Sequence, residues 1–134
     1  MQSSPEISTA RITLLQPRGG DGSSPLWVYA GHVAKVDGQP AAGDVVDVVT
    51  PNGRFYGRGL YNPHSKIRVR LLAFDETPID ESFWRERIRQ AIRLRKRVVS
   101  NSTAYRLIHG EGDRLPGLIV DQIGRAHVST PVTL

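Results

Sequence analysis

The sequence contains no cysteine among its 134 residues. This absence excludes a disulfide framework, a zinc site with cysteine ligands and a cysteine nucleophile within the chain. Long apolar runs are also missing, because no stretch approaches the ~20 apolar residues that a membrane-spanning helix needs. The N-terminal residues lack a basic segment followed by an apolar one, which is the pattern of a secretory signal. We therefore expect a cytoplasmic protein that does not associate with a membrane.

The sequence motifs of common enzymes are absent too. There is no nucleophile elbow, no P-loop and no H-E-x-x-H zinc motif. The glycine pairs in "GRG" (57–59) and "GEG" (110–112) lack a third glycine, and such pairs more often mark turns with a positive φ than phosphate loops. Glu111 and Asp113 could form a pair of catalytic carboxylates, or could instead be solvated or cap nearby N–H groups. The four histidines have no metal-ligand spacing. We expect no catalytic residue, metal or cofactor in this chain.

The charge is positive and unevenly distributed. The chain carries a formal net charge of +5. Residues 1–79 contribute +1 of this charge, with 8 Lys and Arg against 7 Asp and Glu, and residues 80–134 contribute +4, with 10 against 6. A basic balance favours nucleic acid or another polyanion as a partner. It is weak support by itself, since many basic proteins bind neither.

Residues 11–74 read as a run of short strands separated by turn signals. Strands are expected at "ARITLLQP" (10–17), "LWVYAGHVAKV" (26–36), "VVDVVT" (45–50), "RFYGRGLY" (54–61) and "KIRVRLLAF" (66–74). Trp27 and Tyr29 should share one face of their strand, and Asn52-Gly53 is a strong hairpin signal. Short strands with regularly spaced turns predict a small barrel or pseudo-barrel. Residues 1–10 are expected to be disordered.

One long amphipathic helix is predicted next, over residues 81–99. Asp80 suits its N-cap, and the segment contains neither Gly nor Pro. At ~100° per residue, one half of its surface is apolar. We expect Trp84, Ile88, Ala91, Ile92 and Val98 to be buried against the following hairpin, residues 105–121, or against the barrel.

Cationic side chains gather on the strands around the turn "YNPHS" (61–65). In "KIRVRL" (66–71) every second residue is cationic, so Lys66, Arg68 and Arg70 should share a face while Ile67, Val69 and Leu71 point into the barrel. Arginine forks suit phosphate oxygens, and an exposed aromatic can stack on a base. The candidate RNA-binding residues here are Arg54, Arg58, Tyr61, Lys66, Arg68 and Arg70. The alternative is that these charges only solvate a half-buried strand, with Asp44 and Asp47 as their partners.

A second cationic stripe follows the outer face of the predicted helix. Arg85, Arg89, Arg93 and Lys96 form it, and residues 85–97 hold six Arg and one Lys against a single Glu. A face built only for solubility would mix signs, so these four residues join the candidate RNA-binding set. The alternative is a solvated face on a stand-alone protein-interaction module, whose helix binds a partner protein through its apolar side and which binds no nucleic acid.

Two segments carry a resemblance to a known family. "GRGLYNPHSKIRVR" (57–70) and "RLIHGEGDRLPGLIVD" (106–121), with a basic amphipathic helix between them, resemble the class I SAM-dependent 23S rRNA cytosine-5 methyltransferases. The resemblance covers about residues 27–121. It implies a PUA domain, which grips structured RNA, followed by a small central α+β domain and, in the family, by a Rossmann-like SAM-binding domain. The loop "RGGDGSSPLWVYAG" (18–31) departs from the family, which implies a reshaped corner.

The resemblance ends before the catalytic part of the family begins. "IGRAHVSTPVTL" (123–134) resembles a translated sequencing adapter, so we expect a truncated chain with a non-native tail that does not pack. The expected fold class is α+β: a small PUA-like β pseudo-barrel (11–75), followed by an amphipathic helix and partial β-hairpin of a truncated central domain (76–122). The resemblance implies ribosomal RNA as the partner and S-adenosyl-L-methionine as the cofactor of the full-length parent only. We expect this chain to be inactive alone, and the sequence leaves its target nucleotide and oligomeric state open.

Overall fold

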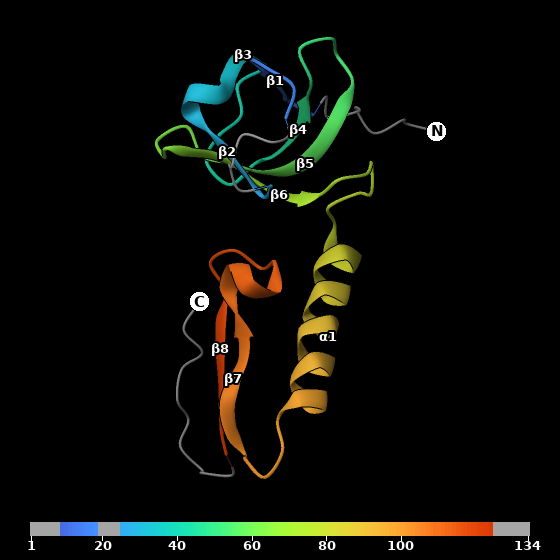
Figure 1. Ribbon diagram of the computed structural model, residues 1–134, viewed down its shortest axis with the longest axis vertical. Helices are drawn as coiled ribbons and strands as arrows, with labels where there is room; N and C mark the ends of the chain where they lie inside the picture. The colour runs from blue at the N-terminus through green and yellow to red at the C-terminus, as the bar shows by residue number, and fades with distance from the viewer. Residues whose placement is uncertain (1–8, 19–24, 125–134) are drawn as a thin grey trace, which may run out of the picture. The chain divides into compact units, whose positions relative to one another are not determined.

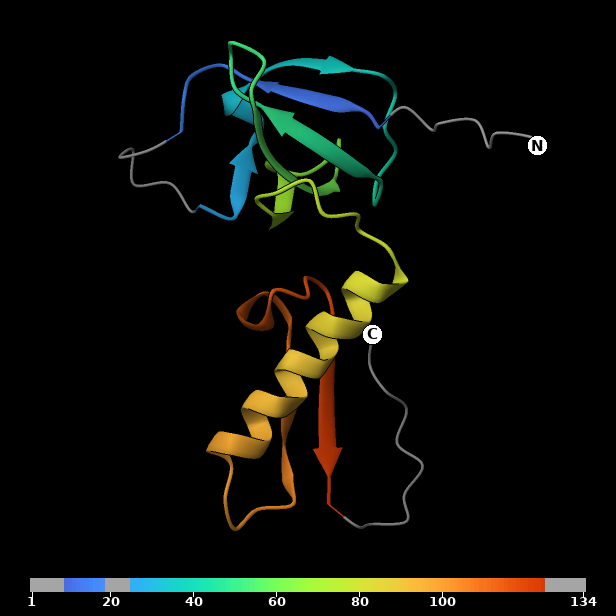
Figure 2. The same ribbon diagram turned by 90° about the vertical axis from the view of Figure 1, so that its right-hand side faces the viewer.

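The computed structural model describes residues 9–18 and 25–124. The chain divides into two units, Met1–Thr77 and Pro78–Leu134 (Figures 1 and 2). Each unit has its own sheet and its own apolar cluster. The units are therefore described one at a time.

The first unit is a single six-stranded sheet that curls into a half-barrel (Figure 1). Its strands are β1 (Arg11–Leu14), β2 (Trp27–Tyr29), β3 (Val33–Asp37), β4 (Val45–Val49), β5 (Phe55–Tyr61) and β6 (Ile67–Ala73). Their order in the sheet is β2-β6-β5-β4-β1-β3, and every pairing is antiparallel except that of β1 with β4. The sequence-based expectation of a small β pseudo-barrel followed by a helix and a hairpin is confirmed.

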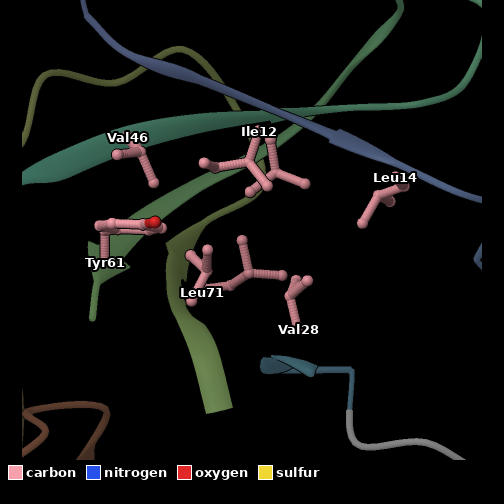
Figure 3. Packing of buried hydrophobic residues seen from close by; sticks show 8 residues of the cluster. Ile12, Leu14, Val28, Val46, Tyr61 and Leu71 are labelled. Atoms are coloured by element: carbon pink, nitrogen blue, oxygen red, sulfur yellow. The ribbon is translucent and has the colours of Figure 1, made fainter. Parts of the chain in front are cut away.

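The core of this unit fills the inside of the curl. It consists of alternate side chains from five strands: Ile12, Leu14, Val28, Val46, Val48, Tyr61, Val69 and Leu71. Figure 3 shows these side chains converging from their strands. On β6, Val69 and Leu71 are buried as the alternation predicts, whereas Ile67 at the start of the strand is only half-buried. Because successive side chains of a strand point to opposite faces, Arg68 and Arg70 lie on the outer face of β6.

The segment predicted as one strand over 26–36 is two strands joined by a 3-10 turn, Ala30–His32. The reason is a change of partner. β2 pairs with β6 and β3 pairs with β1, at opposite edges of the sheet. At the corner, the Ala30 amide donates to the Lys66 carbonyl at 2.8 Å, and the His32 carbonyl accepts from Leu15 at 2.9 Å. A strand pattern does not reveal such a switch, because both halves remain extended.

Gly57 and Gly59 are buried strand residues of β5 and not turn glycines, which corrects the expectation for "GRG". Neither has a positive φ. A Cβ at Gly59 would lie 2.1 Å from the Arg70 carbonyl oxygen, and one at Gly57 would lie 3.1 Å from the Ala73 carbonyl oxygen. Glycine is therefore needed here because the backbones of β5 and β6 approach closely.

The second unit consists of helix α1 (Glu81–Val98) and a hairpin of β7 (Ala104–His109) and β8 (Ile119–Ile123). The N-cap is Asp80, as predicted: its Oδ1 accepts from the Phe83 amide at 2.9 Å. A 3-10 turn, Gly110–Asp113, follows β7. The helix ends at Val98, one residue earlier than expected.

The helix packs on this hairpin through a small apolar cluster. Ala91 is buried, as predicted, together with Ile108 and Leu115 of the hairpin. Trp84 and Ile88, which were expected to be buried, are only partly buried and pack against this cluster. Ile92 is half-buried. The prediction for Val98 is wrong, since that residue is 66% exposed. It lies on the same helical face as Ala91, but the residues of the cluster surround the earlier turns of α1.

The expected start of a non-native tail at Ile123 needs correction. Ile123 is the last residue of β8 and pairs with Ala104, and the Gly124 amide donates to the Thr103 carbonyl at 2.9 Å. The remainder of that expectation, residues 125–134, lies outside the described residues. The domain limits at 11–75 and 76–122 stay predictions.

Candidate nucleic-acid interface

The outer face of β6 carries the cations on which the RNA-binding interpretation was based. Lys66 precedes the strand and is exposed, while Arg68 and Arg70 are half-buried. The Arg68 Nε donates to the Ser65 carbonyl at 3.3 Å, which holds the guanidinium close to the turn before the strand. Arg70 lies in register between two apolar residues, Trp27 of β2 and Leu60 of β5.

Arg58, on neighbouring β5, has a structural role, as the alternative interpretation of these cations predicted. Its Nε donates to Asp47 Oδ1 at 2.6 Å, and its NH1 donates to the carbonyls of Glu76 and Thr77 at 3.0 and 2.9 Å. The two charged side chains are only 16% and 22% exposed. The hydrogen bond to the Asp47 carboxylate raises the pKa of Arg58. Arg58 therefore ties β5 to β4 and to the end of the unit.

The pair belongs to a row of alternating charge across the sheet. Asp37 of β3, Arg11 of β1, Asp47 of β4 and Arg58 of β5 are successive register partners. Opposite charges on neighbouring strands stabilise a sheet, whereas like charges destabilise it. The alternative interpretation, in which acids on an adjacent strand account for the cations, thus holds for Arg58. The register partners of Arg70 are Trp27 and Leu60.

Tyr61 is buried in the core at 6% exposure, so the expectation that it could stack on a base is wrong. The signal was present in the sequence. Arg58 and Tyr61 are three positions apart on one strand, and an odd separation places two residues on opposite faces. The aromatic residues beside the cations of β6 are instead Trp27 and Tyr29 of β2. The sequence predicted that these two residues share a face, but it did not predict that their strand pairs with β6.

Arg54 lies at the β4–β5 hairpin, directly before β5, and is exposed. The hairpin is the Asn52-Gly53 turn that the sequence predicts, with Gly53 at φ +85°. Arg54 lines an open cavity of about 460 Å³ together with Leu15, Pro17, Thr50, Pro51 and Asn52. Its place on the hairpin separates it in the fold from the β6 cations.

The cationic stripe of α1 is exposed, and two glutamates lie beside its arginines. Arg85 forms an ion pair with Glu81, and Glu86 lies 3.9 Å from Arg89 and 3.5 Å from Arg93. Exposed pairs of this kind contribute little to stability. Lys96 and Arg93 line an open cavity of about 480 Å³ with Gln90, Leu94 and Arg97.

Two further arginines of α1 serve the fold of the second unit. Arg95 forms a forked ion pair with Asp113, with N–O distances of 2.8 and 2.6 Å, and Asp113 also accepts from the His109 amide at 2.6 Å. Arg87 lies over the Phe83 ring, and its NH1 donates to the Arg114 carbonyl at 2.8 Å. Both carboxylate oxygens of Asp113 are therefore engaged in structural contacts, which fits its interpretation as a capping residue.

In the parts of the chain that the structure describes, no helix is long and apolar enough to cross a membrane. Residues 23–74 match the family model described as a PUA-like domain. The matched range ends within the first unit, after β6. Sequence match and half-barrel fold agree, so this unit is a PUA-like domain.

Curated relatives extend the similarity into the second unit. Ribosomal RNA large subunit methyltransferase I of Vibrio cholerae is 40% identical over 98 residues, which are 72% of this chain and 25% of that protein. The chain thus spans about a quarter of the length of the curated relatives it matches.

Two solved structures share the fold. A protein from Streptococcus mutans, assigned as a SAM-dependent methyltransferase, has a TM-score of 0.62 and 17% identity, over 85% of this chain and 30% of its own. SMU.776, assigned as a methyltransferase and solved in complex with SAH, has a TM-score of 0.55 and 20% identity. The match covers 64% of this chain and 23% of SMU.776. The chain therefore contains a PUA-like domain and is homologous to the N-terminal part of the ribosomal RNA large subunit methyltransferase I proteins.

Proposed function

We propose that this chain is the RNA-binding N-terminal portion of a SAM-dependent rRNA large-subunit (cytosine-5) methyltransferase that acts in the cytoplasm on ribosomal RNA. The similarity to ribosomal RNA large subunit methyltransferase I across both units carries the proposal. The PUA-like domain supports it, and so does the cationic outer face of β6. The +5 net charge agrees with a polyanionic partner.

The RNA contacts of this proposal go chiefly to phosphates. Lys66, Arg68 and Arg70 offer cationic donors on or beside one strand, and the planar forks of the two arginines suit phosphate oxygens. Arg54 on the hairpin of the first unit is a further candidate phosphate contact. In the second unit, the candidates are Arg85, Arg89, Arg93 and Lys96 on α1. Arg58 is not counted among the phosphate contacts, because its guanidinium already binds Asp47 and two carbonyls. Its role in this proposal is to stabilise the sheet.

Neither glycine pair offers a loop that fits S-adenosyl-L-methionine. The close contacts of Gly57 and Gly59 with β6 leave no space for a ligand, and the "GEG" glycines lie in or beside a 3-10 turn that Asp113 caps. SAM would supply the methyl group in the full-length parent. In this proposal the present chain binds and orients the RNA, and no step of methyl transfer is assigned to its residues.

The test is a titration of RNA hairpins of several sequences with the Arg68→Ala/Arg70→Ala double variant, with its fold checked by circular dichroism. Affinity should fall alike for all sequences, and the slope of log affinity against log salt should become shallower by roughly one unit per lost phosphate contact. The control is Lys35→Ala/Arg106→Ala. It removes the same charge from residues that are ion-paired with Asp37 and Asp121.

An unchanged affinity of the folded Arg68→Ala/Arg70→Ala variant would refute phosphate binding at β6. An equal loss in the control would mean that only net charge matters. If the unaltered protein binds none of the RNAs, the RNA-binding function itself fails, and a protein-interaction module becomes the better interpretation. Docking of an apolar helix face would depend little on salt, which distinguishes the two.

A further inference from the structure

We propose that Trp27, Tyr29 and His32 form a stacking surface for unpaired RNA bases, next to the phosphate-binding cations of β6. The proposal rests on the RNA-binding function proposed above and adds to it the part of the RNA that this site recognises. It concerns aromatic residues that lie outside the cationic set. The ligand class is a single-stranded segment of RNA, such as a loop or a bulge.

The three rings form a continuous row on one face of the sheet edge. Trp27 and Tyr29 meet edge to face, with ring centroids 6.3 Å apart and planes at 84°. Tyr29 and His32 repeat the arrangement at 6.0 Å and 83°. Val28, between the two aromatic residues, is fully buried, so Trp27 and Tyr29 lie on the outer face. His32 is exposed at the corner that follows β2.

This row lies directly beside the cations. β2 is the edge strand next to β6, as Figures 1 and 2 show. Trp27 is the register partner of Arg70, and Tyr29 that of Ile67. The register of β2 against β6 shifts between Val28 and Tyr29. Beyond the end of β2, the Ala30 amide donates to the Lys66 carbonyl at 2.8 Å. Aromatic rings and cations thus occupy adjacent strands of one face.

That combination matches the chemistry of an unpaired RNA strand. Its bases present π-faces that stack on aromatic side chains irrespective of sequence, while its phosphates need cations close by. Bases inside a duplex are already stacked on their neighbours and offer no free face. Aromatic pairs can also serve only to stabilise a sheet. In that case the protein would show no preference for single-stranded RNA over duplex RNA.

The fluorescence of Trp27 provides a direct test. The chain has two tryptophans, so Trp84→Phe leaves Trp27 as the only tryptophan. This variant is titrated with a 12-nucleotide oligoadenylate, with a blunt RNA duplex and with inorganic polyphosphate, and binding is followed independently by competition against a labelled RNA. The oligoadenylate should quench Trp27 emission at the concentrations where it binds. Polyphosphate should bind without quenching, because it has charge and no bases.

Affinity measurements with Trp27→Leu supply the second arm. Oligoadenylate affinity should fall about 10-fold, which is ~1.4 kcal/mol and within the range for one stacked base. The salt slope should stay unchanged, since no phosphate contact is removed. Trp27→Phe, which keeps a ring, should bind within about threefold of the unaltered protein. Phe74→Leu is the matched control, because it removes another exposed aromatic ring of the same unit.

The outcomes separate this proposal from the function on which it rests. Oligoadenylate binding with no quenching of Trp27 and no effect of Trp27→Leu would overturn the stacking surface and leave RNA binding intact. Equal quenching by polyphosphate would also overturn it, since quenching would then report charge alone. If none of the RNAs binds, both proposals fail together. If Trp27→Leu does not fold, the quenching comparison in the Trp84→Phe variant still decides.

Discussion

The guanidinium of Arg58 reaches a carboxylate on β4 and two carbonyls at the end of the first unit. Arg54, four residues earlier in the same basic segment, is exposed on the hairpin. Two arginines that look equivalent in the sequence therefore have different energetic roles. A largely buried charge needs its partners, because the partner left behind after a substitution keeps its desolvation cost.

We predict that Arg58→Ala destabilises the protein by about 2 kcal/mol, because it leaves the Asp47 carboxylate largely buried without its donor. Arg54→Ala, the control, should change stability by less than ~0.5 kcal/mol, since its side chain is exposed. Urea denaturation followed by circular dichroism measures both. Equal midpoints for the two variants would show that the Asp47 pair contributes nothing, and Arg58 would then return to the set of candidate phosphate contacts.

Helix α1 is joined to the hairpin by polar as well as apolar contacts. Arg95 in its last turns reaches Asp113 in the 3-10 turn, and its Nε also donates to the Arg106 carbonyl of β7 at 3.2 Å. The ion pair is 15% exposed on the arginine side and 5% on the aspartate side. The same carboxylate caps the turn through the His109 amide. One acidic residue thus fixes helix, strand and turn together.

We predict that Asp113→Ala costs ~3 kcal/mol, because it leaves the buried guanidinium of Arg95 without its carboxylate. Combining it with Arg95→Ala should cost clearly less than the sum of the two single changes, since the second substitution removes that unpaired charge. Arg97→Ala on the exposed side of the same helix serves as the control. Loss of helical ellipticity with urea gives the free energies. Strict additivity of the two changes would contradict the pairing.

At the scale of the whole molecule, the chain has two units with cores of different size. In the described residues, eight buried side chains form the cluster of the first unit and three form that of the second. Burial of apolar surface is the main source of stability, at about 25 cal/mol per Å².

We predict that the second unit opens at a lower free energy than the first. Native-state hydrogen exchange should show faster exchange for the amides of α1, β7 and β8 than for those of β4, β5 and β6. The smaller cluster around Ala91 is the reason. Equal protection across both units would contradict this prediction and would indicate that they unfold together as one cooperative body.

Local patterns in the sequence determined a good part of this architecture. The alternation of Val69 and Leu71 predicted which face of β6 is buried, Asn52-Gly53 predicted the hairpin, and Asp80 predicted the start of α1. These features depend on backbone periodicity and on hydrogen bonds between residues close in the chain. They are therefore visible without knowledge of the fold.

The tertiary structure decided what each charged and aromatic residue does. Asp47 neutralises Arg58 because β4 and β5 pair in one register, and Trp27 lies beside Arg70 because β2 joins the sheet at β6. Val98 stays exposed because the hairpin's apolar residues gather around earlier turns of the helix. Each of these outcomes depends on which distant segments become neighbours. Alternation in the sequence indicates the buried face of a strand such as β6, but only the folded sheet specifies which residues lie across from it.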